Sequence, residues 1–158
     1  MPRKIDLAKA PKVAGTLYPA PFDEPCRKRH RTQLGDAAGL TQFGVNLCRL
    51  PAGAWSSQRH WHTREDELIF VVEGEVVLVT DDGEEILRAG DAAGFKASDP
   101  NGHCFQNRSS RDVVLLEIGT RDDNDAAYYP DIDLVAPPGA VNYAHRDGTP
   151  YPNRERTS

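Results

Sequence analysis

The chain has 158 residues and a net charge of −5 at pH 7, a length that suits one domain with a buried core. The acidic balance argues against a nucleic-acid surface, which needs clustered positive charge. No apolar run approaches the roughly 20 residues of a membrane span, and the start of the chain lacks the apolar segment of a secretory signal. The three cysteines are scattered without metal-type spacing. We therefore expect a cytoplasmic protein with free thiols and with no nucleic-acid or membrane partner.

The first part of the chain shows no sustained period. Residues 1–39 are rich in proline and charge, which indicates an irregular N-terminal arm packed on the domain. This arm contains the basic run RKRHR at 27–31, which we interpret as a solvated stretch. From residue 40 the character changes to short β-type runs. TQFGVNLCRL at 41–50 alternates apolar and polar residues, which is strand periodicity.

The middle of the chain continues this β pattern. DELIFVVEGEVVLVTDDGEEIL at 66–87 is two β-branched runs around EGE, followed by a reversal at DDG, which is a strong hairpin signal. VVLLEIG at 113–119 predicts a last buried strand, and residues 121–158 read as an extended C-terminal tail. No helical period lasts long enough to predict a major helix. We expect an all-β barrel or sandwich over residues 40–120, with irregular arms at both ends.

The segment QRHWHTREDELIF at 58–70 places two of the five histidines one residue apart, before three consecutive acids. On a strand, His60 and His62 leave the same face. Two imidazoles on one face suit a divalent metal, which also accepts a carboxylate. Strand parity puts Glu65 and Glu67 on one face and Asp66 on the other. The inward acid is therefore Glu65 or Glu67.

A third histidine, His103, lies in PNGHCFQN at 100–107, another short β-like stretch. Cys104 alternates to the face opposite His103, so we do not expect it to be a nucleophile. Phe95 and Phe105 are interpreted as barrel lining.

These segments resemble the two motifs of the cupin family. The first motif, G-x5-H-x-H-x(3,4)-E-x6-G, is similar to residues 53–74, with one extra residue before the first histidine, and its Glu-to-Gly spacing selects Glu67. The second, G-x5-P-x-G-x2-H-x3-N, is similar to residues 90–107, with His103 and Asn107 in place. Its loop is two residues longer, and Lys96 stands where proline is usual. The resemblance covers roughly residues 40–120.

The likeness is to bacterial single-domain cupins of the conserved-barrel (cupin 2) type that are described as sugar-phosphate-isomerase-like. It implies a double-stranded β-helix, or jelly-roll, barrel. It also implies one divalent ion such as Zn, Mn, Fe or Ni, and a turn or supporting role for Asn107. The implied metal ligands are His60, His62, Glu67 and His103.

Four protein ligands on an octahedral ion leave two neighbouring positions, where a hydroxy-carbonyl or hydroxy-acid can chelate. This favours isomerisation, or a related non-redox step, on a small oxygen-rich substrate such as a sugar, a sugar phosphate or a hydroxy acid. An Fe(II) or Mn(II) dioxygenase stays open as an alternative, as does a cupin that binds a small ligand or regulates without catalysis.

Basic residues crowd the two motifs and would suit a phosphate or carboxylate on the substrate. The substrate-binding candidates are Arg49, Arg59 and Lys96. No unique general base stands out. Candidates by residue type are Lys96, His145, Tyr128, Tyr129, Tyr143 and Tyr151. We also expect a homodimer, because open sheet edges invite pairing.

Overall fold

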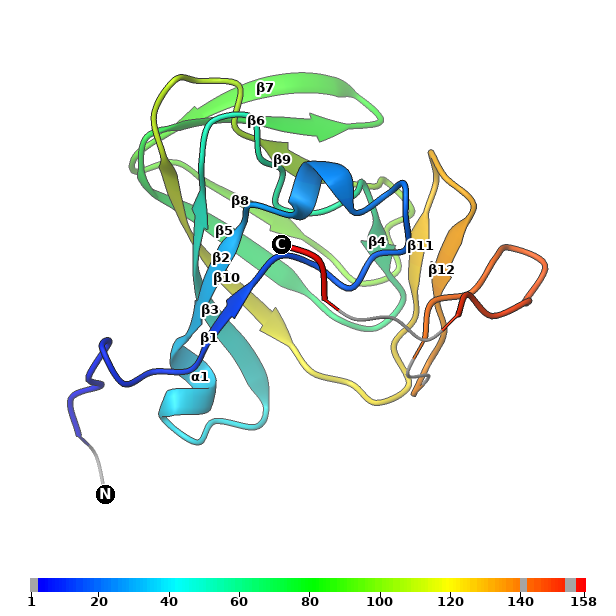
Figure 1. The fold of residues 1–158 in the computed structure, drawn as a ribbon, viewed down its shortest axis with the longest axis horizontal. Coiled ribbons are helices and arrows are strands. Elements are labelled where there is room, and N and C mark those ends of the chain that lie inside the picture. Colours follow the sequence, from blue (N-terminus) through cyan, green and yellow to red (C-terminus); the bar gives the residue numbers. More distant parts are fainter. Residues whose placement is uncertain (1–2, 140–141, 153–155) are drawn as a thin grey trace.

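The chain folds almost entirely into β-strands (Figure 1), and the computed structural model describes residues 3–139, 142–152 and 156–158. Helical structure in these ranges is limited to the single turn α1 (Leu34–Ala37) and the 3-10 turn η1 (Glu24–Cys26). None of it is long and apolar enough to cross a membrane. The all-β prediction is confirmed. In chain order the strands are β1 (Lys12–Ala14), β2 (His30–Gln33), β3 (Phe43–Leu50), β4 (Trp61–His62), β5 (Glu67–Glu73), β6 (Glu75–Thr80), β7 (Gly83–Arg88), β8 (Ala92–Phe95), β9 (Cys104–Gln106), β10 (Val113–Thr120), β11 (Ala127–Tyr129) and β12 (Leu134–Ala136).

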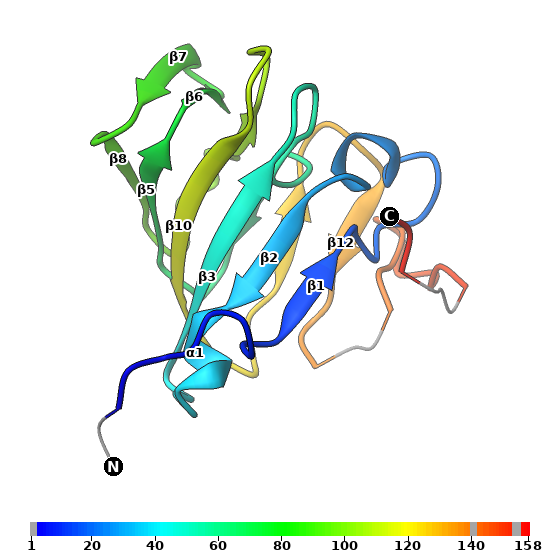
Figure 2. The ribbon, with the colours of Figure 1, turned by 60° about the vertical axis from the view of Figure 1, so that its left-hand side comes forward.

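The strands form three antiparallel sheets. The largest has the order β1-β2-β3-β10-β5-β8, and Figure 2 shows β1, β2, β3 and β10 side by side. A second sheet has the order β7-β6-β9, and a third β12-β11-β4. One apolar core joins the first two sheets, because alternate residues of their strands point inward. Its fully buried members include Leu50, Val71, Val76, Val113 and Leu115.

The two reversals predicted around 74 and 82 have different roles. At the DDG reversal, β6 and β7 pair directly, with Thr80 opposite Gly83, so this is a hairpin as predicted. The EGE reversal instead carries the chain from the six-stranded sheet into the second sheet. Gly74 allows this corner because it has a φ of 88°, and a Cβ there would lie 2.9 Å from the carbonyl oxygen of Asp112.

The N-terminal arm contributes strands to the main sheet. β1 pairs with β2, and β2 pairs with β3, with Arg31 opposite Cys48. Burial alternates along the basic run as it enters β2, so Arg29 is 7% exposed whereas its neighbours Lys28 and His30 are exposed. Our interpretation of this run as a solvated stretch was therefore wrong for Arg29. Charged residues in the run hid the strand periodicity.

The C-terminal segment is also more regular than the sequence indicates. β11 pairs with β12 on one side and with β4 on the other, with Ala127 opposite His62. A second apolar cluster lies here and includes Tyr18, Cys26 and Tyr129. The third sheet thus packs part of the tail against the strand that carries His62. The sequence did not reveal these strands because three residues are too few to show a recognisable period.

Candidate metal centre

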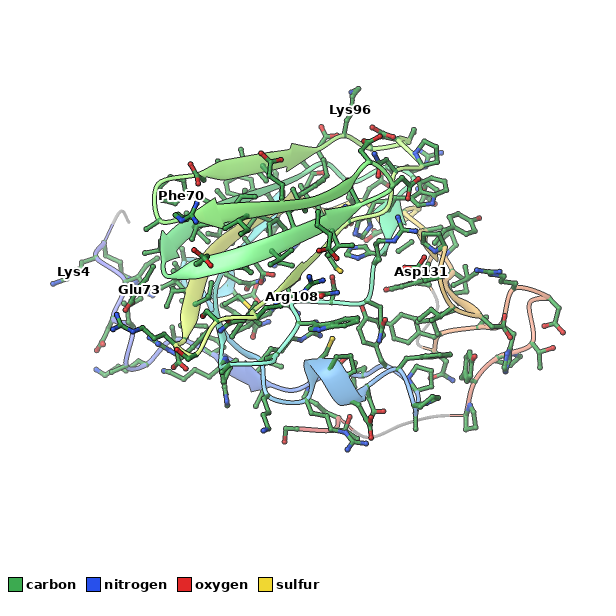
Figure 3. All side chains as sticks on the ribbon, turned by 90° about the horizontal axis from the view of Figure 1, so that it is seen from above. Lys4, Phe70, Glu73, Lys96, Arg108 and Asp131 are labelled. Atoms are coloured by element: carbon green, nitrogen blue, oxygen red, sulfur yellow. The ribbon has the colours of Figure 1, made fainter. Side chains whose placement is uncertain are left out.

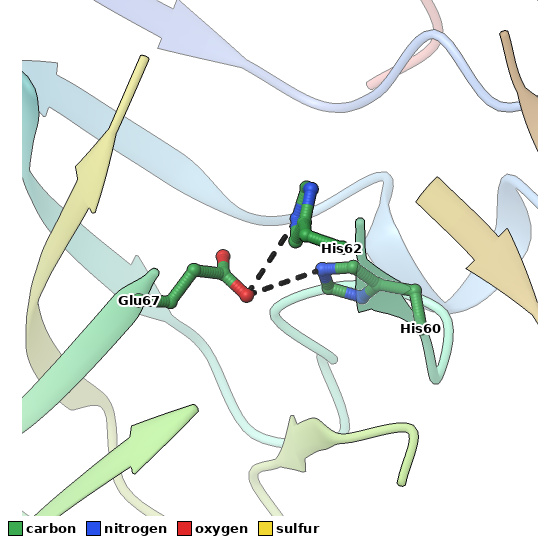
Figure 4. A group of neighbouring side chains, drawn as sticks. All are labelled: His60, His62 and Glu67. Carbon is green, nitrogen blue, oxygen red and sulfur yellow. Dashed lines mark ion pairs between the residues drawn. The ribbon is translucent and has the colours of Figure 1, made fainter. Parts of the chain in front are cut away.

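The four predicted ligands come together although they lie on three different parts of the chain. His62 lies on β4, and Glu67 is the first residue of β5. His60 and His103 are joined by a pair of backbone hydrogen bonds just before β4 and β9. Glu67 Oε2 lies 3.7 Å from His60 Nε2 and 3.6 Å from His62 Nε2 (Figure 4). His103 Nε2 lies 2.8 Å from the same oxygen.

These separations fit a bound metal ion. The ligand atoms of His60, His62 and Glu67 all lie within 4.8 Å of one another. An ion bonded at about 2.0–2.2 Å holds neighbouring ligand atoms about 3.0–3.5 Å apart. Despite its 2.8 Å contact with His103, the buried Glu67 Oε2 has no partner with hydrogen-bond geometry among the described residues. A buried carboxylate oxygen without a proton donor needs another source of positive charge, and a divalent cation supplies it.

The tautomers of two histidines also suit metal binding. His60 Nδ1 lies 2.9 Å from the carbonyl oxygen of Gln58, which can only accept, so Nδ1 carries the hydrogen. His62 Nδ1 lies 2.6 Å from Asp125 Oδ2 and donates to that carboxylate in the same way. In both rings the Nε2 lone pair is then directed to the cluster. Such outer hydrogen bonds orient a metal-binding imidazole and raise its basicity.

The protonation of the cluster agrees with this arrangement. Burial alone would raise the pKa of Glu67, but the imidazoles of His103 and His60 hold that pKa well below its usual range. Burial lowers the pKa of His103, although Glu67 opposes the change. An ionised carboxylate and a neutral imidazole are the forms that bind a metal.

The structure separates the three consecutive acids. Glu67 meets the histidine Nε2 atoms, whereas Glu65 Oε1 accepts from the backbone N–H of Asp122 at 2.9 Å. Asp66 is exposed and accepts from the N–H of Ala97 at 2.7 Å. Strand parity alone did not decide whether Glu65 or Glu67 faces the histidines. In the structure Glu67 faces them, whereas Glu65 accepts a backbone hydrogen bond.

Asp125 is the residue that the sequence did not reveal. Its Oδ2 accepts from His62, and its Oδ1 accepts from the N–H groups of Arg64 at 2.7 Å and Glu65 at 3.2 Å. It therefore fixes both the imidazole and the turn after β4. Asp125 is 63 residues from His62 and belongs to the acidic run DDND at 122–125, which gives no local sign of this contact.

Aromatic rings hold two of the imidazoles in place. Phe95 stacks on His103 with ring centroids 3.6 Å apart and an interplanar angle of 5°. Tyr129 of β11 stacks on His60 at 5.6 Å. Phe95 was predicted to line the barrel, and it packs against the core. The contact of Tyr129 arises because the third sheet places β11 beside β4.

Two cavities of about 180 Å³ each lie at this cluster, and both are lined in part by Glu67 and His103. We call the first the outer cavity, and its other lining residues include Trp61, His62, Glu65, Lys96 and Asn101. We call the second the inner cavity, and its other lining residues include Tyr18, Arg29, Arg31, His60, Glu117 and Tyr143.

The predicted substrate-binding residues do not all lie at these cavities. Lys96 lines the outer cavity. Arg49 is exposed and pairs with Asp112 at 3.3 Å, and it lines neither cavity. Arg59 also lies elsewhere, because its guanidinium pairs with Asp131 at 2.7 Å and with Asp81.

The candidate bases divide in the same way. Lys96 and Tyr143 line the cavities. Tyr128 stacks on Trp61 at 5.1 Å and is exposed. His145 and Tyr151 stack on each other at 3.9 Å, away from the cluster's contacts.

The two remaining residues singled out in the second motif are structural in their contacts. Asn107 is buried, and its Nδ2 donates to the carbonyl oxygens of Leu50 at 2.8 Å and Arg111 at 2.7 Å. It therefore holds a turn. Burial raises the pKa of the Cys104 thiol to about 12, which keeps it protonated at neutral pH. All three cysteines are free, as expected, and all three are buried.

The fold and cluster belong to a known class. Residues 46–119 match the cupin domain. The crystal structure of a sugar phosphate isomerase from a cupin superfamily, from Silicibacter pomeroyi, matches with a TM-score of 0.89 and 42% identity, over 95% of this chain and 97% of that chain. The chain therefore belongs to the cupin superfamily, and the predicted cupin barrel is confirmed.

Two further structures extend the comparison. A candidate sugar phosphate isomerase from Acidithiobacillus ferrooxidans matches with a TM-score of 0.70 and 29% identity, over 81% of this chain and 82% of that chain. The polyketide cyclase RemF from Streptomyces resistomycificus has a TM-score of 0.60 but 16% identity, over 77% of this chain and 81% of that chain, and so it shows the fold alone. No curated protein sequence matches the chain significantly.

Proposed function

We propose that this protein is a metal-dependent enzyme that isomerises a small phosphorylated sugar. One observation carries the proposal: three imidazole Nε2 atoms gather around a single Glu67 oxygen between two cavities. The similarity to the Silicibacter pomeroyi protein, which is described as a sugar phosphate isomerase, supports the substrate class. His60, His62, Glu67 and His103 would hold the ion.

The chemistry follows from what such a site offers. A bound divalent ion acts as a Lewis acid that polarises a carbonyl and orients the neighbouring hydroxyl. Interconversion of an aldose and a ketose moves a proton between adjacent carbons, so a side chain must accept and return it. Besides Glu67, the carboxylates at the two cavities are Glu65, Asp99 and Glu117. The cavity volumes suit a small substrate.

The test is an isomerase assay in D2O. A small panel of aldose phosphates is incubated with the metal-loaded protein. At least one of them should be converted into its ketose, and NMR should show deuterium at the carbon beside the carbonyl. Glu67→Gln should abolish both signals, because it removes the anionic ligand. Stoichiometric O2 uptake would instead make the protein a dioxygenase. If a sugar phosphate binds but none of the panel exchanges a proton for deuterium, the protein would be a ligand-binding cupin.

We also propose the homodimer and the cytoplasmic location that the sequence predicts. Apolar side chains alternate outward along β5, where Leu68, Phe70 and Val72 are 44%, 37% and 46% exposed. A second copy could bury this row. Light scattering should give twice the monomer mass at micromolar concentration, and the monomer mass would contradict the dimer.

A further inference from the structure

Arg29 is a buried cation without a carboxylate partner. It is 7% exposed, and its Nε donates to the carbonyl oxygen of Gly15 at 3.0 Å. Its Nη1 donates to the carbonyl oxygen of Ser56. Among the described residues, no carboxylate lies within ion-pair distance of Arg29, and its Nη2 has no hydrogen-bond partner. A buried charge is costly unless it is paired, so this guanidinium calls for an anion.

The neighbouring charges do not supply that anion. Arg31 forms a bidentate pair with Glu117, at 2.7 Å from Nε to Oε1 and 3.0 Å from Nη2 to Oε2. This pair uses the carboxylate of Glu117. Arg156 adds further positive charge, because its Nη1 donates at 3.3 Å to the same Gly15 carbonyl oxygen that Arg29 contacts. The region around Arg29 therefore has an excess of positive charge.

This excess lies beside the candidate metal centre. Arg29 and Arg31 line the inner cavity together with His60, Glu67 and His103. The strand register explains why, since Arg31 lies opposite the buried Cys48 on the inward face of the six-stranded sheet. Arg29 precedes it by two residues and so shares that face. One small cavity thus joins metal-ligand candidates to two arginines.

We propose that the inner cavity binds the phosphate group of the substrate through Arg29 and Arg31, while the sugar end reaches the metal. This inference rests on the proposed function for the identity of the substrate. The planar guanidinium is fixed by two backbone carbonyls, which preorganises it for a phosphate oxygen. Burial raises the pKa of the Tyr18 phenol, so its neutral hydroxyl adds a donor to the cavity wall.

The outer cavity is the competing place for a phosphate, because Lys96 lines it. Lys96 is exposed and, as Figure 3 shows, projects from the edge of the molecule. A solvated ammonium needs no counter-ion. The buried Arg29 does, and so the charge balance favours the inner cavity.

The test is calorimetric titration of inorganic phosphate into the metal-loaded full-length protein. Arg29→Gln should weaken phosphate binding at least about tenfold, and Arg31→Gln about threefold or more. Arg49→Gln is the matched control, because it removes the same charge from an exposed ion pair that lines neither cavity, and its affinity should stay within twofold. Metal content and melting temperature of each variant show that the fold and the cluster persist.

Three outcomes would overturn the inference. Phosphate that binds wild type and Arg29→Gln equally is held by the metal or at another place. If phosphate does not bind to the wild-type protein at millimolar concentration, the inner cavity is not a phosphate site. Acetate that binds as tightly as phosphate, with the same Arg29 dependence, would assign the cavity to a carboxylate substrate. If phosphate binds as predicted but no sugar phosphate is isomerised, the anion site stands and only the proposed reaction fails.

Discussion

Replacing Glu67 by glutamine should strip the metal and lower the affinity for the metal by more than about 100-fold. This effect is larger than the one expected when a residue that only hydrogen-bonds to a metal ligand is lost. The substitution keeps the size of the side chain but removes the negative charge at which His60, His62 and His103 converge. The barrel should stay folded, because its core is built from apolar side chains such as Val71 and Leu115. Metal content after dialysis, with circular dichroism of the same sample, measures both effects.

Asp66→Asn is the matched control for this substitution. Asp66 is the adjacent acid, but it is exposed and accepts from the N–H of Ala97, outside the cluster. The metal content of the Asp66→Asn protein should equal that of the wild-type protein. A protein that keeps its metal in Glu67→Gln and loses it in Asp66→Asn would show that the wrong acid has been assigned to the site.

Replacing Asp125 by alanine should weaken metal affinity 10–100-fold without removing any ligand atom. The reason is its 2.6 Å contact with His62 Nδ1, which orients the imidazole and favours the tautomer with a free Nε2. Competition with a metal chelator of known affinity measures the change. The melting temperature separates this effect from unfolding.

The chain offers a close control for Asp125. Asp133 accepts from His145 Nδ1 at 2.7 Å, the same imidazole–carboxylate contact at an exposed site. Asp133→Ala should leave metal affinity unchanged. Equal loss of affinity in both variants would mean that Asp125 acts through general stability and not through His62.

Most of the barrel could be predicted from local patterns. Long strands such as β3, β5 and β10 alternate clearly, and the DDG turn marks the β6–β7 hairpin. The strands of both arms could not be predicted, because β1, β11 and β12 have three residues each and β2 is a run of four polar residues, HRTQ. Their pairing depends on tertiary contacts, which a local period does not contain.

The candidate site divides in the same way. The spacing of His60, His62, Glu67 and His103 follows the two cupin motifs, so sequence alone could name them. Asp125 and Arg29 could not be found from sequence, since one lies in an acidic run and the other in a basic run that looks solvated. Their roles follow from long-range contacts and from burial, which only the folded chain reveals.

The most direct test of the central claim is anomalous X-ray diffraction from crystals of the metal-loaded protein, collected at the absorption edge of the bound metal. We expect one strong peak bonded to the Nε2 atoms of His60, His62 and His103 and to a carboxylate oxygen of Glu67, at about 2.0–2.2 Å. A peak at any other residues, or no peak in crystals soaked with Zn, Mn, Fe or Ni, would contradict the assignment of a metal site to this cluster.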